Sequence, residues 1–376
     1  MNNVIVKEHI LHNHKNVVTK RMVLHVGYAC NERCTFCYYL EQIESGKTDN
    51  LTTDEIKARL LQGRKWGKNA IDFTGGEPTI RKDFVEVVAY AKEIGYIHIN
   101  VITNGLIVGR RKSYLQTLVN AGLNDILFSL HSFSPELHDN LTKVPKSHES
   151  VLMGVDKARK IEGLNLRFNY VVNQENFHEL SQAVELMASK EPNAINLILF
   201  HPNHQAINAN QSVKFNSYEV ITTEVKEAID SIKDRVPHIN VRHIPYCLMK
   251  GYEQHVKPFY QLQYEKVEWD YCLSTLQKRG RLIYLAGLAG GIILSLNNPY
   301  FWKADWDNKK HLAIQRIQLL KMRKKGKKCT QCALNHICDG LQKEYIKNYG
   351  DKELSPYDGD MIYNPTYFMP RDEIES

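Results

Sequence analysis

The chain has 376 residues, 43% hydrophobic and 24% charged, a composition typical of a folded globular protein and not of a disordered one. Its formal net charge of +7 is concentrated in a lysine-rich run at 321–328, which we interpret as a solvated connector, because charge alone does not establish nucleic-acid binding. No basic start is followed by an apolar core near the N-terminus, so we expect no secretion and a cytoplasmic location.

The longest apolar stretch, residues 282–296, is shorter than a bilayer span and contains three glycines. We therefore predict that it is buried core, and we expect no membrane partner. The eight cysteines fall mainly into two tight clusters, which in a reducing compartment indicates metal sites more often than disulfides.

From residue 21 to 245, short apolar or β-branched runs alternate with stretches of helical period. Strands are predicted at 22–26, 71–73, 97–102, 126–130, 166–172 and 195–200. The first helix is predicted to open at Thr52, where Glu55 three residues later completes a capping box. Further helices are expected near 84–91, 115–118, 150–161, 175–189 and 217–233.

This alternation predicts an α/β fold with at least six βα units, a partial (βα)6 TIM-like barrel. Right-handed crossovers would place every strand-to-helix loop at one end, so we expect the chemistry directly after strands. Beyond 245 the period is lost and aromatic residues collect, which predicts a smaller, irregular domain organised by metal. The expected divisions are an N-terminal segment at 1–20, the barrel at 21–245, the metal-binding domain at 246–350 and a tail at 351–376.

Directly after the first predicted strand, the sequence CNERCTFC places three thiols, Cys30, Cys34 and Cys37, within one short loop. Three thiolates can hold three irons of a [4Fe–4S] cube and leave the fourth open, whereas a structural zinc site needs four protein ligands, and no fourth lies nearby. The motif resembles the CxxxCxφC signature of the radical S-adenosylmethionine (SAM) superfamily, with Phe36 in the aromatic position. The resemblance implies a [4Fe–4S] cluster that binds SAM.

A glycine-rich turn follows the second predicted strand, where this family carries one: Gly75, Gly76, Glu77 and Pro78. Two glycines let a backbone approach a ligand and expose amides to a carboxylate, while Glu77 attracts an ammonium group. We therefore expect these four residues to bind the amino-acid end of SAM.

The resemblance also assigns SAM contacts to Thr103 and Ser129 at the ends of the third and fourth strands, and less directly to Asn169 and Asn173. Three histidines in this part of the chain are expected to cap turns or bind backbone, not metal: His131, His138 and His201.

Near the other end, KKCTQCALNHIC gives a CxxCx5C spacing with Cys329, Cys332 and Cys338. It resembles the SPASM and twitch extensions of radical SAM enzymes, which hold auxiliary iron–sulfur clusters. The further cysteine of the full SPASM pattern is replaced by Gln342, which implies one auxiliary [4Fe–4S] cluster. The candidates for its fourth ligand are Cys247, which we favour because it follows the last strand-like run, and Cys272. A four-cysteine zinc site remains the alternative.

The resemblance implies an enzyme that takes an electron from a donor such as flavodoxin or ferredoxin, cleaves SAM reductively, and abstracts hydrogen from a substrate through a 5′-deoxyadenosyl radical. A peptide or protein is the favoured substrate, and a nucleotide or a sugar is the alternative. A third interpretation is a non-enzymatic, RNA-associated metal-binding protein that uses the lysine run and aromatic residues. That interpretation leaves the pairing of an incomplete cysteine set with a glycine–glutamate turn unexplained.

Overall fold

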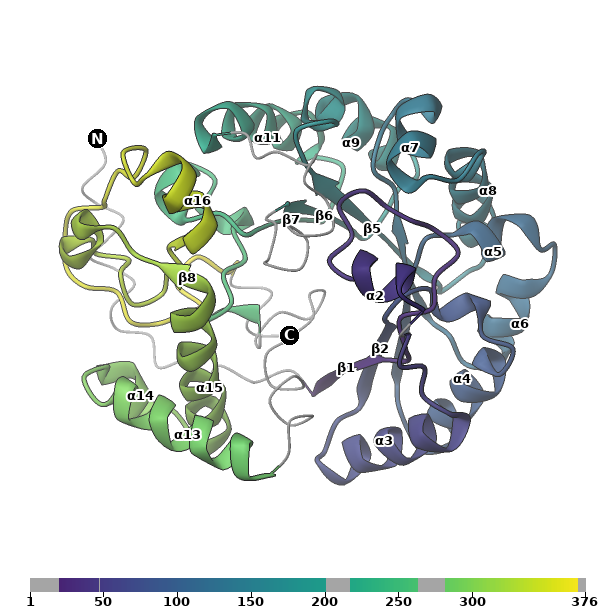
Figure 1. The fold of residues 1–376 in the computed structure, drawn as a ribbon, viewed down its shortest axis with the longest axis horizontal. Coiled ribbons are helices and arrows are strands. Elements are labelled where there is room, and N and C mark those ends of the chain that lie inside the picture. The colour runs from purple at the N-terminus through teal and green to yellow at the C-terminus, as the bar shows by residue number, and fades with distance from the viewer. Residues whose placement is uncertain (1–19, 47, 201–216, 263–280, 371–376) are drawn as a thin grey trace. The chain divides into compact units, whose positions relative to one another are not determined.

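A computed structural model describes residues 20–46, 48–200, 217–262 and 281–370 (Figure 1). The chain divides into two compact units, Lys20–Val241 and a unit that begins at Arg242, and each is described by itself.

The first unit is built on a seven-stranded sheet whose strands lie in chain order, with every neighbouring pair from β1 to β6 parallel. The sheet curls into a partial barrel, which confirms the predicted fold class (Figure 1). All six predicted strands are present, and β7 follows as a seventh. The strands are β1 (Arg21–His25), β2 (Ala70–Thr74), β3 (His98–Thr103), β4 (Asp125–Ser129), β5 (Asn165–Val172), β6 (Ala194–Leu199) and β7 (His238–Arg242).

Helices cover the outer face of the curled sheet, and the predicted capping box at Thr52 and Glu55 is present at the start of α3 (Figure 1). Three short helices that the sequence pattern did not predict, α2, α5 and α7, lie in the loops after strands. The helices that the structure describes in this unit are α2 (Leu40–Glu44), α3 (Thr53–Lys65), α4 (Phe84–Glu93), α5 (Leu106–Arg110), α6 (Tyr114–Ala121), α7 (Pro135–Thr142), α8 (Ser147–Ala158), α9 (Leu180–Ala188) and α11 (Tyr218–Ile232).

The two faces of the sheet have opposite chemistry. Apolar side chains point towards the helices: Phe73 meets Phe84 of α4 edge to face with ring centroids 5.5 Å apart. The opposite face carries a buried polar set in which Asp72 binds Arg21 and Asn100, both at 2.7 Å. Buried charges require such partners, so this face is held by pairing and not by apolar packing.

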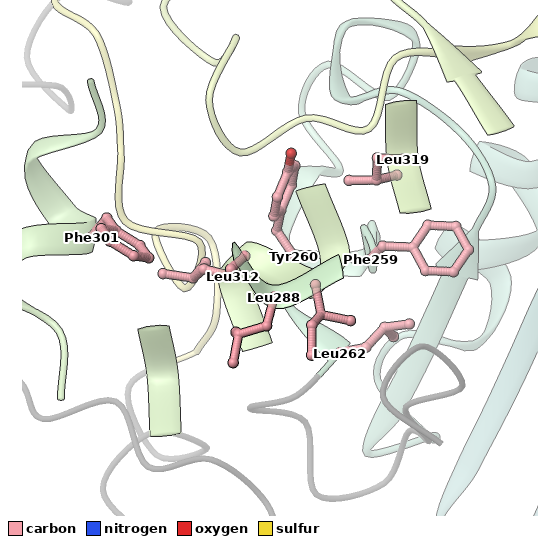
Figure 2. Packing of buried hydrophobic residues seen from close by; sticks show 9 residues of the cluster. Phe259, Tyr260, Leu262, Leu288, Phe301, Leu312 and Leu319 are labelled. Atoms are coloured by element: carbon pink, nitrogen blue, oxygen red, sulfur yellow. The ribbon is translucent and has the colours of Figure 1, made fainter. Parts of the chain in front are cut away.

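The second unit contains more helix than predicted. Its core packs Leu288 of α13 and Leu312 of α15 against an aromatic segment at Phe259 and Tyr260 (Figure 2). These helices add regular structure that the sequence pattern did not predict in this domain. Its described helices and strands are α13 (Arg281–Ser295), α14 (Pro299–Lys303), α15 (Trp306–Met322), β8 (Arg323–Lys324), β9 (Leu341–Gln342) and α16 (Lys343–Tyr349).

The prediction that residues 282–296 are buried core was wrong. Leu282 is 83% exposed and Ile293 67% exposed, because α13 packs on α15 through one stripe only. In that stripe Gly291 lets the helices approach so closely that a Cβ there would lie 2.0 Å from the carbonyl oxygen of Ala313. An apolar helix with no polar face gives no periodic signal, which explains why the sequence pattern missed it. None of the helices that the structure describes is long and apolar enough to cross a membrane.

Candidate active site

The three N-terminal cysteines lie on one loop that leaves the carboxyl end of β1. The amide of Cys37 donates to the carbonyl of Cys34 at 3.0 Å, which closes a turn between two of the thiols. The amides of Glu32 and Tyr39 lie 3.4 Å from the sulfurs of Cys30 and Cys37. Backbone N–H groups directed at sulfur stabilise thiolates, as an iron–sulfur ligand set requires.

Phe36 anchors this loop, hereafter the cluster loop (residues 30–37), through apolar packing. Its ring packs with Leu141 and Phe200 and meets the ring of His131 edge to face at 4.7 Å. The backbone adds two bonds, from the amides of residues 33 and 35 to carbonyls at the end of α7. The aromatic position of the motif therefore holds the loop in place.

Without a metal, burial favours the neutral thiol at all three cysteines. Burial, with a smaller contribution from the charge of Glu77, raises the pKa of Cys30 to about 12. Burial also raises the pKa of Cys34 and of Cys37. Because metal ligands must be thiolates, iron would supply the positive charge that these buried sulfurs need.

The glycine-rich turn after β2 packs directly against the segment that joins β1 to the cluster loop. The amides of Gly76 and Glu77 each donate at 2.8 Å, to the carbonyls of Gly27 and Ala29. A Cβ on Gly76 would lie 2.1 Å from the carbonyl oxygen of Ala29, so only glycine fits. Both amides therefore bind the chain itself, although we expected the Gly76 amide to face a carboxylate.

Glu77 is fully buried and accepts several hydrogen bonds. Its Oε1 accepts from the amide and hydroxyl of Thr79 and from the hydroxyl of Thr103 at 2.8 Å, and its Oε2 accepts from the amide of Asn104 at 2.7 Å. Burial raises its pKa, and these donors oppose the rise. Pro78 opens the short 3-10 turn that brings Thr79 back to the carboxylate. The predicted residues Glu77 and Thr103 are thus in direct contact.

Sequence reasoning did not assign a role to Asn104 or Asn31, which join the end of β3 to the cluster loop. The side-chain amide nitrogen of Asn104, Nδ2, donates to the side-chain oxygen of Asn31 at 2.8 Å and lies 3.9 Å from the sulfur of Cys30. The Asn-Gly pair after a strand was the only local signal for Asn104.

The remaining predicted residues lie on the neighbouring strands. Ser129 and Asn169 are register partners on β4 and β5, and the Asn169 side chain accepts from Asn196 at 2.9 Å. Asn173 closes a turn, because its side-chain oxygen accepts from the amide of Glu175 at 2.8 Å.

Of the three histidines, His138 accepts a hydrogen bond from the backbone of His131, and His131 accepts one from the amide of Val171. His201 lies outside the described residues.

The family model described as the radical SAM superfamily matches residues 24–187, which carry the cluster loop and the glycine-rich turn. This part of the chain is a radical SAM domain. Two curated relatives of that domain are named probable GTP 3′,8-cyclase. The one from Saccharolobus solfataricus is 34% identical and the one from Sulfolobus acidocaldarius 31% identical, each over 175 residues and 46% of this chain. The matches cover 55% and 54% of those proteins, so this chain spans about half their length.

Two solved structures resemble the fold over a longer range. Streptococcus suis SuiB is 14% identical, with a TM-score of 0.52, over 91% of this chain and 76% of that one. HydG, a maturase of the [FeFe]-hydrogenase, is 13% identical, with a TM-score of 0.50, over 81% of this chain and 78% of that one. At these identities the likeness shows the fold alone.

Outside the radical SAM domain, the second unit brings four cysteines to one pocket. Cys247 lines it together with the three cysteines of the CxxCx5C motif. The other lining residues are Pro245, Tyr246, Lys325, Leu334, Asn335, Gly340, Leu354, Pro356 and Tyr357. The structure thus groups Cys247 with the motif, whereas Cys272 lies outside the described residues.

Hydrogen bonds and charge around this pocket suit thiolate ligands. The amide of Tyr357 lies 3.4 Å from the sulfur of Cys332, and the amide of Gly340 lies 3.5 Å from that of Cys338. Burial raises the pKa of Cys338 to about 12, and the positive charge of Lys325 opposes the rise. In the described part of the chain, no three His, Cys, Asp or Glu side chains are grouped for a single metal ion, at either cysteine site.

Proposed function

We propose that the protein is a radical SAM enzyme whose first cluster is held by Cys30, Cys34 and Cys37. The observation that carries the proposal is the packing of the glycine-rich turn against a three-cysteine loop, inside a domain that matches the radical SAM superfamily. When bound, the [4Fe–4S] cluster supplies one electron to SAM, whose cleavage gives methionine and a 5′-deoxyadenosyl radical.

The protein's own residues would position SAM and exclude water. Three thiolates leave one iron open to the amino and carboxylate groups of SAM. Glu77, already fixed by Thr103 and Asn104, supplies negative charge beside the cluster loop for the ammonium group. We place Ser129 and Asn169 on the neighbouring strands as further SAM contacts, and treat Asn173 as a turn residue that shapes the site.

The experiment measures SAM cleavage without substrate. Anaerobically reconstituted protein reduced with dithionite should release 5′-deoxyadenosine slowly. Replacing the three N-terminal cysteines together by Ala should abolish this release, because no ligand would remain for the first cluster. Equal release by the triple variant would refute the proposal.

The pocket of the second unit supports an auxiliary [4Fe–4S] cluster held by Cys247, Cys329, Cys332 and Cys338. Four thiolates would saturate its irons, so we propose that it transfers electrons and does not bind substrate directly. In this scheme an external one-electron donor, a flavodoxin or a ferredoxin, reduces the first cluster. Reconstituted protein should then hold about eight irons per chain, whereas a preparation that holds only zinc would contradict both clusters.

For the substrate we keep two candidates. A peptide or protein is the first candidate. A nucleotide is the second, and it is favoured by the name of the curated relatives, probable GTP 3′,8-cyclase. A substrate that enters the site should raise the rate of 5′-deoxyadenosine release above the rate without substrate. Stimulation by GTP would support the nucleotide. Stimulation by a peptide encoded beside this gene, with no effect of GTP, would support the peptide.

A further inference from the structure

A buried carboxylate lies inside the cluster loop, between two of the cysteines. Glu32 is 4% exposed, although its neighbours along the loop are more open to solvent. Its Oε2 lies 3.3 Å from the sulfur of Cys34, and its Oε1 accepts from the hydroxyl of Ser147 at 2.7 Å. Because burying a carboxylate is costly, its position calls for a specific role.

The hydrogen-bond chain continues from Ser147 into α7. The Ser147 hydroxyl lies 3.4 Å from Nε2 of His138, and Nδ1 of His138 accepts from the amide of His131 at 3.1 Å. Since Nδ1 accepts, the proton of the neutral ring sits on Nε2, which then donates to Ser147. Every donor in the chain therefore points towards Glu32. Ser147 and His138 are both fully buried.

These hydrogen bonds connect the cluster loop to two helices. Ser147 is the first residue of α8, and His138 belongs to α7. The end of α7 also receives the amides of Arg33 and Thr35, at 3.0 and 2.9 Å. Iron binding removes the thiol proton of Cys34 but leaves the Ser147 hydroxyl in place, so the bond from Ser147 to Glu32 is the one that persists in the loaded protein.

We propose that Glu32 is a positioning residue, which acts through Ser147 to hold the Cys34 end of the cluster loop in the geometry that retains the first cluster. The inference rests on the proposed first cluster. It requires a hydrogen-bond acceptor at position 32, and it does not require a charge there.

The test compares Glu32→Ala, Ser147→Ala and Glu32→Gln in the full, reconstituted chain. The first cluster is identified by the EPR signal that changes when SAM is added, and its half-life is followed under an iron chelator. Glu32→Ala and Ser147→Ala should each shorten that half-life about tenfold, as expected when one buried hydrogen bond is lost and its partner is left unpaired. Glu32→Gln should restore most of it, because the amide oxygen still accepts from Ser147.

The matched control is Ser150→Ala on the same helix. Ser150 is also buried, but its hydroxyl bonds Lys146 and Arg110 and not the cluster loop. The control should leave the half-life unchanged, even where the thermal midpoint of the iron-free chain falls. If Glu32→Ala does not fold, the cluster half-life of Ser147→Ala alone tests the inference.

Wild-type half-lives in Glu32→Ala and Ser147→Ala would overturn the inference, as would a Glu32→Gln variant as labile as Glu32→Ala. A wild-type chain that takes up no more iron than its triple cysteine variant would instead refute the first cluster itself.

Discussion

The two cysteine sites are built in different ways. At the first, three thiols lie within one short loop, and the rest of the domain contributes hydrogen bonds and packing that hold this loop. At the second, Cys247 joins a pocket whose other thiols lie on a distant segment of the chain. A local set leaves an iron open, whereas a set assembled from two segments supplies a fourth thiolate. The first arrangement suits binding of SAM, and the second suits transfer of electrons.

The largest effect is expected from a methyl group at Gly76, where backbone lies directly against backbone. Gly76→Ala places a Cβ 2.1 Å from the carbonyl oxygen of Ala29, so the segment that joins β1 to the cluster loop has to move. Overpacking of this kind costs about 1–3 kcal/mol, and we expect SAM cleavage to fall about tenfold or more. The auxiliary cluster should keep its EPR signal, since it lies in the other unit.

The control for this prediction is Gly290→Ala on α13. Its new Cβ would make an ordinary contact 3.4 Å from Ile317, so iron content and SAM cleavage should match wild type. If Gly76→Ala cleaves SAM as fast as wild type, then an added methyl group is tolerated at Gly76 as well as at Gly290, and the prediction is wrong.

The second prediction separates the candidates for the fourth auxiliary ligand. Cys247→Ala should lower iron from about eight to about four per chain, or change the auxiliary EPR signal, because three thiolates cannot saturate a cube. SAM cleavage without substrate should stay within about twofold of wild type, since the first cluster keeps all its ligands.

Cys272→Ala serves as the comparison and should retain both clusters. The reverse outcome would transfer the ligand role to Cys272. If neither change affects iron content or EPR, the auxiliary cluster has an open iron and the contrast between the two sites disappears.

The last prediction concerns the pH dependence of stability in the radical SAM domain, which should leave SAM cleavage near pH 7 unaffected. Burial lowers the pKa of His131 from 6.5 to about 3. Below pH 6.5 the unfolded chain binds a proton that the folded chain does not, so stability falls as the pH drops from about 6.5 towards 3. His131 alone contributes about 2 kcal/mol to the loss at pH 5 relative to pH 7.

The measurement is the free energy of unfolding in denaturant at pH 7 and pH 5. His131→Asn keeps an acceptor for the amide of Val171 but does not titrate, so its loss of stability should be smaller by about 2 kcal/mol. An equal loss in variant and wild type would contradict a neutral, buried His131.

The strands were predictable because each is a short apolar or β-branched run between stretches of helical period. The spacing of the cysteines indicated two candidate ligand sets. Their supports were not predictable: Asn104 and Ser147 are single polar residues far along the chain, and only folding brings them to the loop. Helix α13 was missed because its exposed and buried faces have the same composition. Local sequence patterns thus indicate candidate ligands and secondary-structure elements. Contacts between residues far apart in the sequence are seen only in the structure.

The anchoring of the cluster loop has a consequence for biosynthesis. The loop at residues 30–37 is held by Gly76, Asn104, the end of α7 and Ser147, all of which leave the ribosome after it. Its cysteines are therefore made early but gain their shape only after residue 147 has emerged and α8 has docked. Until then the three thiols do not have the geometry of the folded loop. Iron delivered to the nascent chain would therefore bind cysteines that lack the fixed geometry needed to select among metals.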